Sequence, residues 1–510
     1  MSTPTNPISP ARRWGALAVL VASLLVITMD MTILNIALPR MASELHPTSD
    51  QQLWIIDIYS LVLAGLLVSF AAIADRWGRK RMLLLGYAVF GLASLLVLFA
   101  NTAEAVIAIR ALLGVGGAMI MPTTLSLIRV IFLSPKERAT ALSIWGAISG
   151  MGAAVGPLVG GMLLEHFSWP AAFLINVPLM LLGAIAGVLV LPESRVPNPG
   201  RWDFFAALLS LLGMTLTIWA IKTFGARASL LEPDALAAFA LGIALLTWFI
   251  VRCLRSDAPL LELRLFRNRA FSAGIIAALG SMFAMSAALL LLAQWMQIID
   301  GATPVEAGIR LFPIAIAGAV ASLAAPPMAQ WIGARAVLGG GIGIAGLGML
   351  LIGLQPGELS NVSVIIALVL VGGGTGSLAI GSAMIMLGSP EEKAGSAGAL
   401  EETSYEFGAL LGVAILGSIA SLLYRAELRT AEAVQALPGE LAKQAEDSLG
   451  AAAAIAEKLQ LPELVQQAGT AFTSSMQITG IVGGAIMVAV AVLVFLLTPK
   501  GTDVTAQAHH

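Results

Sequence analysis

Long apolar runs alternate with short polar interruptions along almost the whole chain. A helix that crosses a bilayer needs about 20 mostly apolar residues, so the charges, Pro/Gly turns and Asn/Asp clusters between runs mark the helix ends. The pattern predicts an all-α integral membrane protein with 14 spanning helices. Their expected ranges are 14–38, 53–74, 82–100, 104–130, 139–163, 170–191, 204–223, 235–252, 270–298, 305–331, 336–354, 362–387, 395–424 and 472–497.

The distribution of basic residues supports this arrangement. If both termini are cytoplasmic, 19 of the 28 Lys and Arg residues fall on the cytoplasmic side, as the positive-inside rule requires. Only Arg40, Arg227 and Arg310 lie at short outer connections. The first apolar run follows Arg12 and Arg13 but has no small-residue cleavage site, so it is interpreted as a retained helix.

A weak internal repeat divides the predicted helices into two sets. The hexapeptide SPKERA at 134–139 is echoed by SPEEKA at 389–394, and the same separation of 255 residues carries WGRK at 77–80 onto IGAR at 332–335. These matches pair helices 2 and 5 with helices 10 and 13, which predicts two parallel six-helix bundles, helices 1–6 and 9–14. Chance similarity between loops is the alternative.

The repeat also sets the expected domain limits. An N-terminal bundle covers 1–195, two inserted helices (7 and 8) and a cytoplasmic amphipathic linker cover 196–269, and a C-terminal bundle covers 270–510. The stretch PLLELRLFRNRAF in the linker mixes arginines with leucines, which suits a short helix on the inner leaflet. The long loop 425–470 is expected to form an outer hairpin or cap, and a solvated linker is equally compatible with its composition.

Composition excludes several classes of function. Hydrophobic residues make up 58% of the chain and charged residues 11%, which is far too apolar for a soluble protein. A net charge of −2 without a basic block excludes nucleic-acid partners. One cysteine and four histidines leave no clustered metal ligands, and no G-x-x-x-x-G-K-[ST] motif for ATP occurs. The sequence thus predicts no catalytic centre, metal or cofactor, and a secondary transporter rather than an enzyme.

A basic turn connects the second and third predicted helices. In the stretch DRWGRKR, Gly78 permits a tight reversal and Asp75 can cap or pair with a helix end. Arg76, Arg79 and Lys80 would meet the anionic inner surface of the membrane. The turn is interpreted either as a cytoplasmic gate or as a plain topology anchor.

The fifth predicted helix is rich in glycine. Gly152, Gly156 and Gly160 are four residues apart, with Gly161 beside them, and this spacing lets helix backbones approach closely. Pro157 removes a backbone hydrogen bond and permits bending. The pattern indicates plain helix packing or a flexing seam between the bundles.

These stretches resemble signature motifs of the major facilitator superfamily. The turn is similar to its helix 2 to 3 motif, with Ala71 in place of the usual leading glycine, and the helix 5 stretch resembles its antiporter pattern. RALLGVGG at 110–117 resembles its helix 4 motif, while 30–39 and 53–60 are similar to the fourteen-span drug:proton antiporter branch. The most similar group is the bacterial exporters of quaternary ammonium compounds and methyl viologen. The resemblance implies bundles that rock around a central cavity in the bacterial cytoplasmic membrane, exchanging protons for substrate, and we expect a monomer.

Charged residues within the predicted spans are functional candidates, because an ionised side chain at the bilayer centre costs at least ~2.5–3.5 kcal/mol. Asp30, Asp57 and Arg110 all fall in the outer part of the N-terminal bundle, where they could form one cluster. Arg110 would then form a permanent ion pair, or a proton or cationic substrate would compete with it for a carboxylate. Lys222 lies close to the outer interface, where its side chain can snorkel.

The thirteenth predicted helix contains three glutamates. Glu402 and Glu406 are four residues apart and share a helix face, about 11 and 17 Å from the cytoplasmic end, and Glu401 lies beside them. No basic residue of the C-terminal bundle lies at that depth. We expect these carboxyl groups to hold protons until a cation or water displaces them. Permanently protonated glutamates that bond neighbouring helices are the alternative.

The excess of intramembrane acids over bases favours a cationic substrate. Aromatic side chains would add cation–π surfaces if they face the cavity, and the candidates are Trp54, Tyr59, Trp145, Trp295 and Tyr405. The sequence therefore predicts proton-coupled efflux of lipophilic cations such as quaternary ammonium biocides, dyes and methyl viologen. Export of an endogenous lipid, siderophore or metabolite by the same fold is the alternative.

Overall fold

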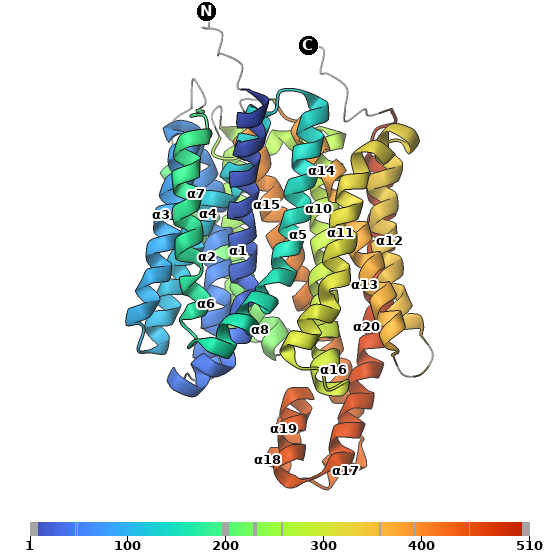
Figure 1. Ribbon diagram of the computed structural model, residues 1–510. Coiled ribbons are helices and arrows are strands. Elements are labelled where there is room, and N and C mark those ends of the chain that lie inside the picture. The colour runs from blue at the N-terminus through green and yellow to red at the C-terminus, as the bar shows by residue number, and fades with distance from the viewer. Residues whose placement is uncertain are drawn as a thin grey trace, which may run out of the picture.

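The structure is a computed structural model that describes residues 9–501, except 46, 48, 196–202, 228–231, 257–258, 356, 358, 391–392 and 448. All regular elements in this part of the chain are helices, which confirms the predicted all-α class. The helices run side by side through one bundle, and the first and last long helices begin and end at the same end of it (Figure 1). We call this the terminal end. A group of short helices projects from the opposite end (Figure 1).

The first half of the chain contains nine helices among the described residues. They are α1 (Pro10–Leu45), α2 (Ser49–Trp77), α3 (Arg79–Leu96), α4 (Ala103–Ile131), α5 (Pro135–His166), α6 (Ala171–Leu174), α7 (Asn176–Val190), α8 (Phe204–Arg227) and α9 (Pro233–Arg255). A 3-10 turn, Val97–Phe99, extends α3, and α6 and α7 follow each other as one apolar segment.

The second half begins with a short 3-10 helix, Leu263–Arg267, within the linker where a short amphipathic helix was expected. The long helices that follow are α10 (Arg269–Gln294), α11 (Pro304–Ile332), α12 (Ala334–Leu354), α13 (Asn361–Thr375), α14 (Leu378–Leu387), α15 (Ala394–Leu411), α16 (Gly417–Leu428) and α20 (Pro462–Leu497). Two π-helical segments interrupt them, η3 (Trp295–Ile299) after α10 and η5 (Gly412–Leu416) between α15 and α16.

The loop expected at 425–470 is largely helical. It contains α17 (Glu432–Gln435), α18 (Gly439–Asp447) and α19 (Leu449–Leu459), which form the projecting group at the end opposite the terminal end (Figure 1). Apolar side chains of these helices, Val434, Ala445, Leu449 and Ala452, are buried. This burial fits the expected cap and argues against a solvated linker.

By length and composition, 12 helices of the described chain are apolar enough to cross a membrane, against the 14 expected. The expected spans 139–163 and 395–424 account for the difference. α5 has 32 residues, but the side chains of 150, 153, 154 and 157 lie outside the described residues, so the apolar stretch described in it is Thr140–Ser149. α15 contains Glu401, Glu402 and Glu406 within 18 residues and ends at a π-helical segment, so composition alone does not mark it as a span.

Packing relationships recur between the two halves. α1 packs on α5 as α10 packs on α15, α2 packs on α4 as α11 packs on α13, and α3 packs on α7 as α12 packs on α20. The separation of 255 residues relates the members of the first two of these pairs, and α3 to α12, whereas α20 lies further along the chain than this separation predicts for α7 because α17, α18 and α19 precede it. Between the halves, α5 packs on α11, and α2 packs on α15.

The helices α8 and α9 lie outside this repeated pattern. α8 packs on α2, where a side chain at Gly65 would lie 2.9 Å from Leu211 Cδ1. Met214 and Ile218 of α8 form an apolar cluster with Leu61 of α2 and Leu410 of α15. α8 therefore covers the seam between α2 and α15, while α9 packs on α8 and leaves most of its apolar surface exposed.

Glycines set the close packing of α12 on α20, and this contact generates a first prediction. A Cβ atom added at Gly484 would lie 2.9 Å from the carbonyl oxygen of Gly346. We expect Gly484→Ala to lower the melting temperature in detergent, because overpacking costs about 1–3 kcal/mol. Gly340→Ala on α12 is the control, since nothing lies within 4 Å of a Cβ there. Equal melting temperatures of the two variants would contradict the packing.

Candidate functional site

A cavity of about 960 Å³ lies between the helices of the two halves. Residues of α1 and α5 line one side, and residues of α10, α11, α15 and α16 line the other. Leu449 of α19 and Phe472 of α20 also line it, so the cavity extends toward the projecting helices. Its wall is mainly apolar, and the described lining residues include two acids, Glu402 and Glu406, and no lysine or arginine.

The three glutamates of α15 are buried but differ in their partners. Glu401 does not line the cavity and accepts hydrogen bonds from Ser382 Oγ and, at 2.7 Å, from Tyr405 Oη. Glu402 is 1% exposed, and its Oε1 has no hydrogen-bond partner within the described residues. A buried carboxylate without a partner gains stability by binding a proton or a cation. Glu401 Oε2 is likewise without a partner among the described residues, but Glu402 lines the cavity, so Glu402 is the one of these two side chains that a ligand can reach.

Two of the predicted aromatic residues meet at the cavity wall. Trp145 of α5 and Tyr405 of α15 stack with ring centroids 6.3 Å apart and an interplanar angle of 27°. Trp145 Nε1 donates to Thr124 Oγ1 at 3.2 Å, which fixes the indole. The two rings come from opposite halves of the chain and form one aromatic surface beside the carboxyl groups.

The other predicted aromatic residues do not line the cavity. Trp54 is 39% exposed, and Tyr59 is buried with its ring 4.6 Å below the Arg110 guanidinium. Ser60, the next residue of α2, reaches the cavity instead, because consecutive helix positions point about 100° apart. Trp295 is buried in η3 and is likewise not part of the described lining.

Four methionines that sequence analysis missed line the cavity: Met31, Met121, Met282 and Met285. The thioether side chain is flexible and polarisable, so it adapts to ligands of different shape. No signal in the sequence separates these methionines from others in apolar runs. Only their common direction in the folded chain identifies them.

Asp30 and Arg110 form a buried ion pair, as their predicted depths suggested. Arg110 Nη1 lies 3.0 Å from Asp30 Oδ2, and Arg110 Nε donates to the carbonyl of Ile55 at 3.1 Å. Asn176 of α7 donates to Asp30 Oδ1 at 2.7 Å. Sequence analysis missed Asn176 because a neutral amide in an apolar run has no charge signature. The side chains of Asp57 and Lys222 lie outside the described residues.

Asp30 faces away from the cavity, but its neighbours on α1 do not. Thr28, Met31 and Thr32 line the cavity, while Asp30 is fully buried among α1, α4 and α7. One helix therefore connects the ion pair to the cavity wall.

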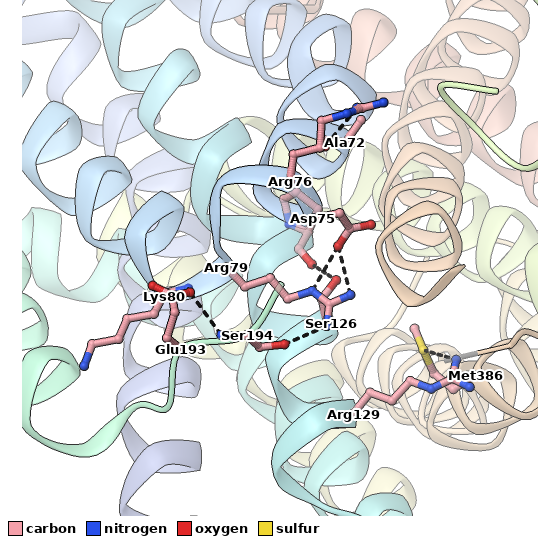
Figure 2. A network of polar contacts seen from close by, with 11 residues as sticks. Ala72, Asp75, Arg76, Arg79, Lys80, Ser126, Arg129, Glu193, Ser194 and Met386 are labelled. Atoms are coloured by element: carbon pink, nitrogen blue, oxygen red, sulfur yellow. Dashed lines mark hydrogen bonds and ion pairs between the residues drawn. The ribbon is translucent and has the colours of Figure 1, made fainter. Parts of the chain in front are cut away.

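The basic turn between α2 and α3 forms a network at the terminal end (Figure 2). Arg79 Nη2 lies 2.8 Å from Asp75 Oδ1, and the Arg79 backbone N–H donates to the carbonyl of Ser194 at 2.8 Å. Lys80 N–H donates to Glu193 Oε1 at 3.2 Å. The turn is thereby joined to the segment that follows α7.

Two further residues of the motif have local roles. Gly78 has φ +125°, a conformation that side chains with a Cβ rarely adopt, so glycine is required at this reversal. Arg76 Nη1 donates to the carbonyl of Ala72 on its own helix at 3.3 Å (Figure 2).

Arg129, at the end of α4, joins the two halves of the chain close to this network. Its Nη1 donates to Ser389 Oγ at 2.7 Å and its Nη2 to the Ser389 carbonyl at 2.5 Å. Arg129 also approaches Met386 of α14 (Figure 2). Nothing in the sequence indicated this contact, because Arg129 and Ser389 are 260 residues apart.

The glycines of α5 lie against α1. A Cβ atom at Gly156 would be 2.7 Å from the carbonyl oxygen of Met29, and one at Gly152 would overlap Thr28 Oγ1. Gly160 and Gly161 are buried further along α5, and the side chain of Pro157 lies outside the described residues. This close contact brings the cavity-lining part of α1 beside α5.

A bundle of long apolar helices around a cavity with buried carboxyl groups defines a membrane transporter. Residues 20–413 match the sequence pattern of the Major Facilitator Superfamily, and the chain belongs to this family. It is therefore a multi-pass membrane transporter and not an enzyme.

Two bacterial proteins are similar to this chain over most of its length. The multidrug efflux pump LfrA of Mycolicibacterium smegmatis is 38% identical over 96% of this chain and 97% of its own. The methyl viologen resistance protein SmvA of Salmonella typhimurium is 36% identical over 88% and 90%. The crystal structure of the human organic anion transporter MFSD10 (TETRAN) is similar in fold, with a TM-score of 0.61, 14% identity, and 96% and 100% of the chains covered.

The buried ion pair supplies a second prediction. Removing one partner of such a pair leaves an uncompensated charge and costs about 3–5 kcal/mol. We expect Arg110→Met to lower the melting temperature in detergent, and the double change Asp30→Asn, Arg110→Met to recover much of the loss, because it removes both charges. A single variant as stable as the unchanged protein would contradict the structural role of the pair.

Proposed function

We propose that this chain is a proton-coupled multidrug efflux antiporter that exports lipophilic cations by alternating access. The observation that carries the proposal is Glu402, a buried carboxyl group without a partner for its Oε1 within the described residues, facing an apolar cavity beside the Trp145–Tyr405 stack. The names of the relatives support it, since one is a multidrug efflux pump and another is a methyl viologen resistance protein.

The chemistry of the cavity suits a lipophilic cation. Glu402 and Glu406 supply negative charge when ionised, and the aromatic faces attract a cation through their quadrupoles. The methionines and other apolar side chains cover the hydrophobic part of the ligand. A wall of this kind accepts cations of several shapes, which is the property that multidrug export requires.

Antiport follows from competition for the same carboxyl groups. A cation that binds Glu402 displaces its proton, and a proton arriving from outside displaces the cation. The pH gradient drives this exchange, and the membrane potential adds about 2.3 kcal/mol per 100 mV for each net charge moved, which requires that more protons enter than cation charges leave. Protonation of Asp30 would weaken its pairing with Arg110 and release α1, whose Met31 lines the cavity.

The proposed topology has fourteen spans, with both termini in the cytoplasm of a bacterial cell. α5 has 32 residues, and α15, η5 and α16 follow one another without a break from 394 to 428, so both segments are long enough to cross. They supply the two spans that composition alone did not mark. The recurring packing supports two six-helix bundles, within 1–195 and 270–510, with α8 and α9 inserted between them.

In this topology the terminal end is cytoplasmic and the cavity extends toward the outside. The DRWGRKR network and the contact of Arg129 with Ser389 then close the cytoplasmic side. Opening to the cytoplasm requires that the Arg129 contact breaks, while the glycine contact of α5 with α1 permits small rearrangements at the cavity wall.

Transport tests the proposal directly. Proteoliposomes with an imposed pH gradient should accumulate ethidium or a quaternary ammonium compound, and a protonophore should abolish the accumulation. Protein-free liposomes are the control. If no cation moves in response to the gradient, the proposal is wrong and export of a lipid, siderophore or metabolite becomes the next candidate.

The carboxyl groups generate a separate prediction. We expect Glu402→Gln and Asp30→Asn each to reduce gradient-driven transport at least tenfold while the protein still inserts into the membrane, because the amide cannot exchange a proton. Glu427→Gln is the matched control, since Glu427 is an exposed acid on α16. Wild-type rates in both buried variants would show that these acids are structural.

A further inference from the structure

The helix that contains the glutamates changes its geometry immediately after them. α15 ends at Leu411, and the next five residues, Gly412–Leu416, are π-helical. A π-helical segment inserts an extra residue into the turn and disturbs the regular pairing of backbone carbonyls, and such segments occur frequently at functional sites. The orientation of the glutamates therefore depends on what holds α15 at this junction.

Ser286 of α10 contacts the backbone of α15 at this junction. The Ser286 hydroxyl donates to the carbonyl of Ala409 at 2.9 Å, three residues before the π-helical segment begins. The same hydroxyl lies within hydrogen-bonding distance of its own helix, 2.8 Å from the carbonyl of Met282 and 3.4 Å from that of Phe283, so its one proton is shared between the two backbones. Ser286 and Ala409 both line the cavity.

Two glycines bring α10 close enough for this bond. A Cβ atom at Gly408 would overlap the carbonyl oxygen of Leu279, and one at Gly412 would overlap that of Phe283 and lie 2.7 Å from Ser286 Oγ. α10 therefore contacts the backbone of α15 directly on both sides of Ala409. A hydrogen bond at this position restrains the helix itself rather than one mobile side chain.

Glu402, Glu406 and Ala409 lie on one face of α15, because residues four and seven positions apart share a helix face. All three line the cavity. Rotation of α15 about its axis would turn both glutamates away from the cavity together. The bond at Ala409 opposes such rotation at the end of this face.

We propose that Ser286 is a positioning residue that keeps the Glu402 and Glu406 face of α15 directed into the cavity. This inference rests on the proposed function for its effect on cation binding, whereas its effect on the backbone of α15 is independent of that function. Ser286 itself neither exchanges a proton nor supplies charge to the ligand.

The experiment compares Ser286→Ala with Ser281→Ala. Ser281 is a fully buried serine of the same helix whose Oγ has no hydrogen-bond partner in the described part of the chain, so its loss should leave α15 unchanged. Hydrogen–deuterium exchange of peptides covering 405–420 should become faster in Ser286→Ala and remain unchanged in Ser281→Ala. Ser286→Thr, which keeps the hydroxyl, should restore the slow exchange.

Cation binding supplies the second measurement. Loss of one hydrogen bond should weaken equilibrium binding of ethidium by about two- to tenfold in Ser286→Ala, with little change in the maximal transport rate. Ser281→Ala should bind as the unchanged protein does, and Ser286→Thr should recover the affinity. This split between affinity and rate distinguishes positioning from a general loss of folded protein.

The outcomes separate the two proposals. Unchanged exchange in Ser286→Ala, or an equal change in Ser281→Ala, would contradict the role of Ser286 whether or not the protein transports cations. Faster exchange with unchanged cation affinity would also contradict it, because the bond would then not position the glutamates. Absence of any cation transport by the unchanged protein would contradict the proposed function alone.

Discussion

The cost of burying carboxyl groups inside an apolar helix bundle is the constraint on which the rest of this structure depends. At Asp30 an ion pair to Arg110 and a hydrogen bond from Asn176 offset the cost of burial. At Glu401 hydrogen bonds from the hydroxyl groups of Ser382 and Tyr405 offset part of this cost. One oxygen of Glu401 and one oxygen of Glu402 have no hydrogen-bond partner within the described residues, and of these two side chains Glu402 is the one that lines the cavity. A ligand or a proton in the cavity can therefore reach the unpaired oxygen of Glu402.

The close packing of the helices determines where such a group can face a cavity. Glycines let α1 approach α5 and let α10 approach α15, so the backbones of each pair lie close together. Cavity residues come from both pairs, and the space between the pairs extends as far as Leu449 of α19 and Phe472 of α20. At the terminal end Arg129 and Ser389 join the halves instead. The same packing therefore closes one end of the molecule and leaves the cavity at the other.

The elements outside the repeated pattern complete this enclosure. α8 packs against both α2 and α15 and covers the seam between the halves. Leu449 of α19 contributes to the cavity wall from the projecting helices. Neither element supplies a charged group to the described cavity lining, so their contribution is to shape and enclosure. Within the described cavity lining, the acidic and basic residues all belong to α15.

The sequence by itself determined the positions of most helices and the presence of acids on one face of α15. These properties are local, because hydropathy depends on consecutive residues and a helix face depends on a fixed spacing. The need for glycine at residue 78 was also visible, since a short basic turn between two helices implies a tight reversal.

Only the tertiary structure decided which residues share the cavity. It placed Trp145 and Tyr405 together, excluded Tyr59, and brought in methionines that have no distinctive sequence pattern. It also joined Arg129 to Ser389 and Asn176 to Asp30 across long stretches of chain. The physical reason is that the rotation of each helix about its axis, and its choice of neighbours, depend on packing among distant segments rather than on local composition.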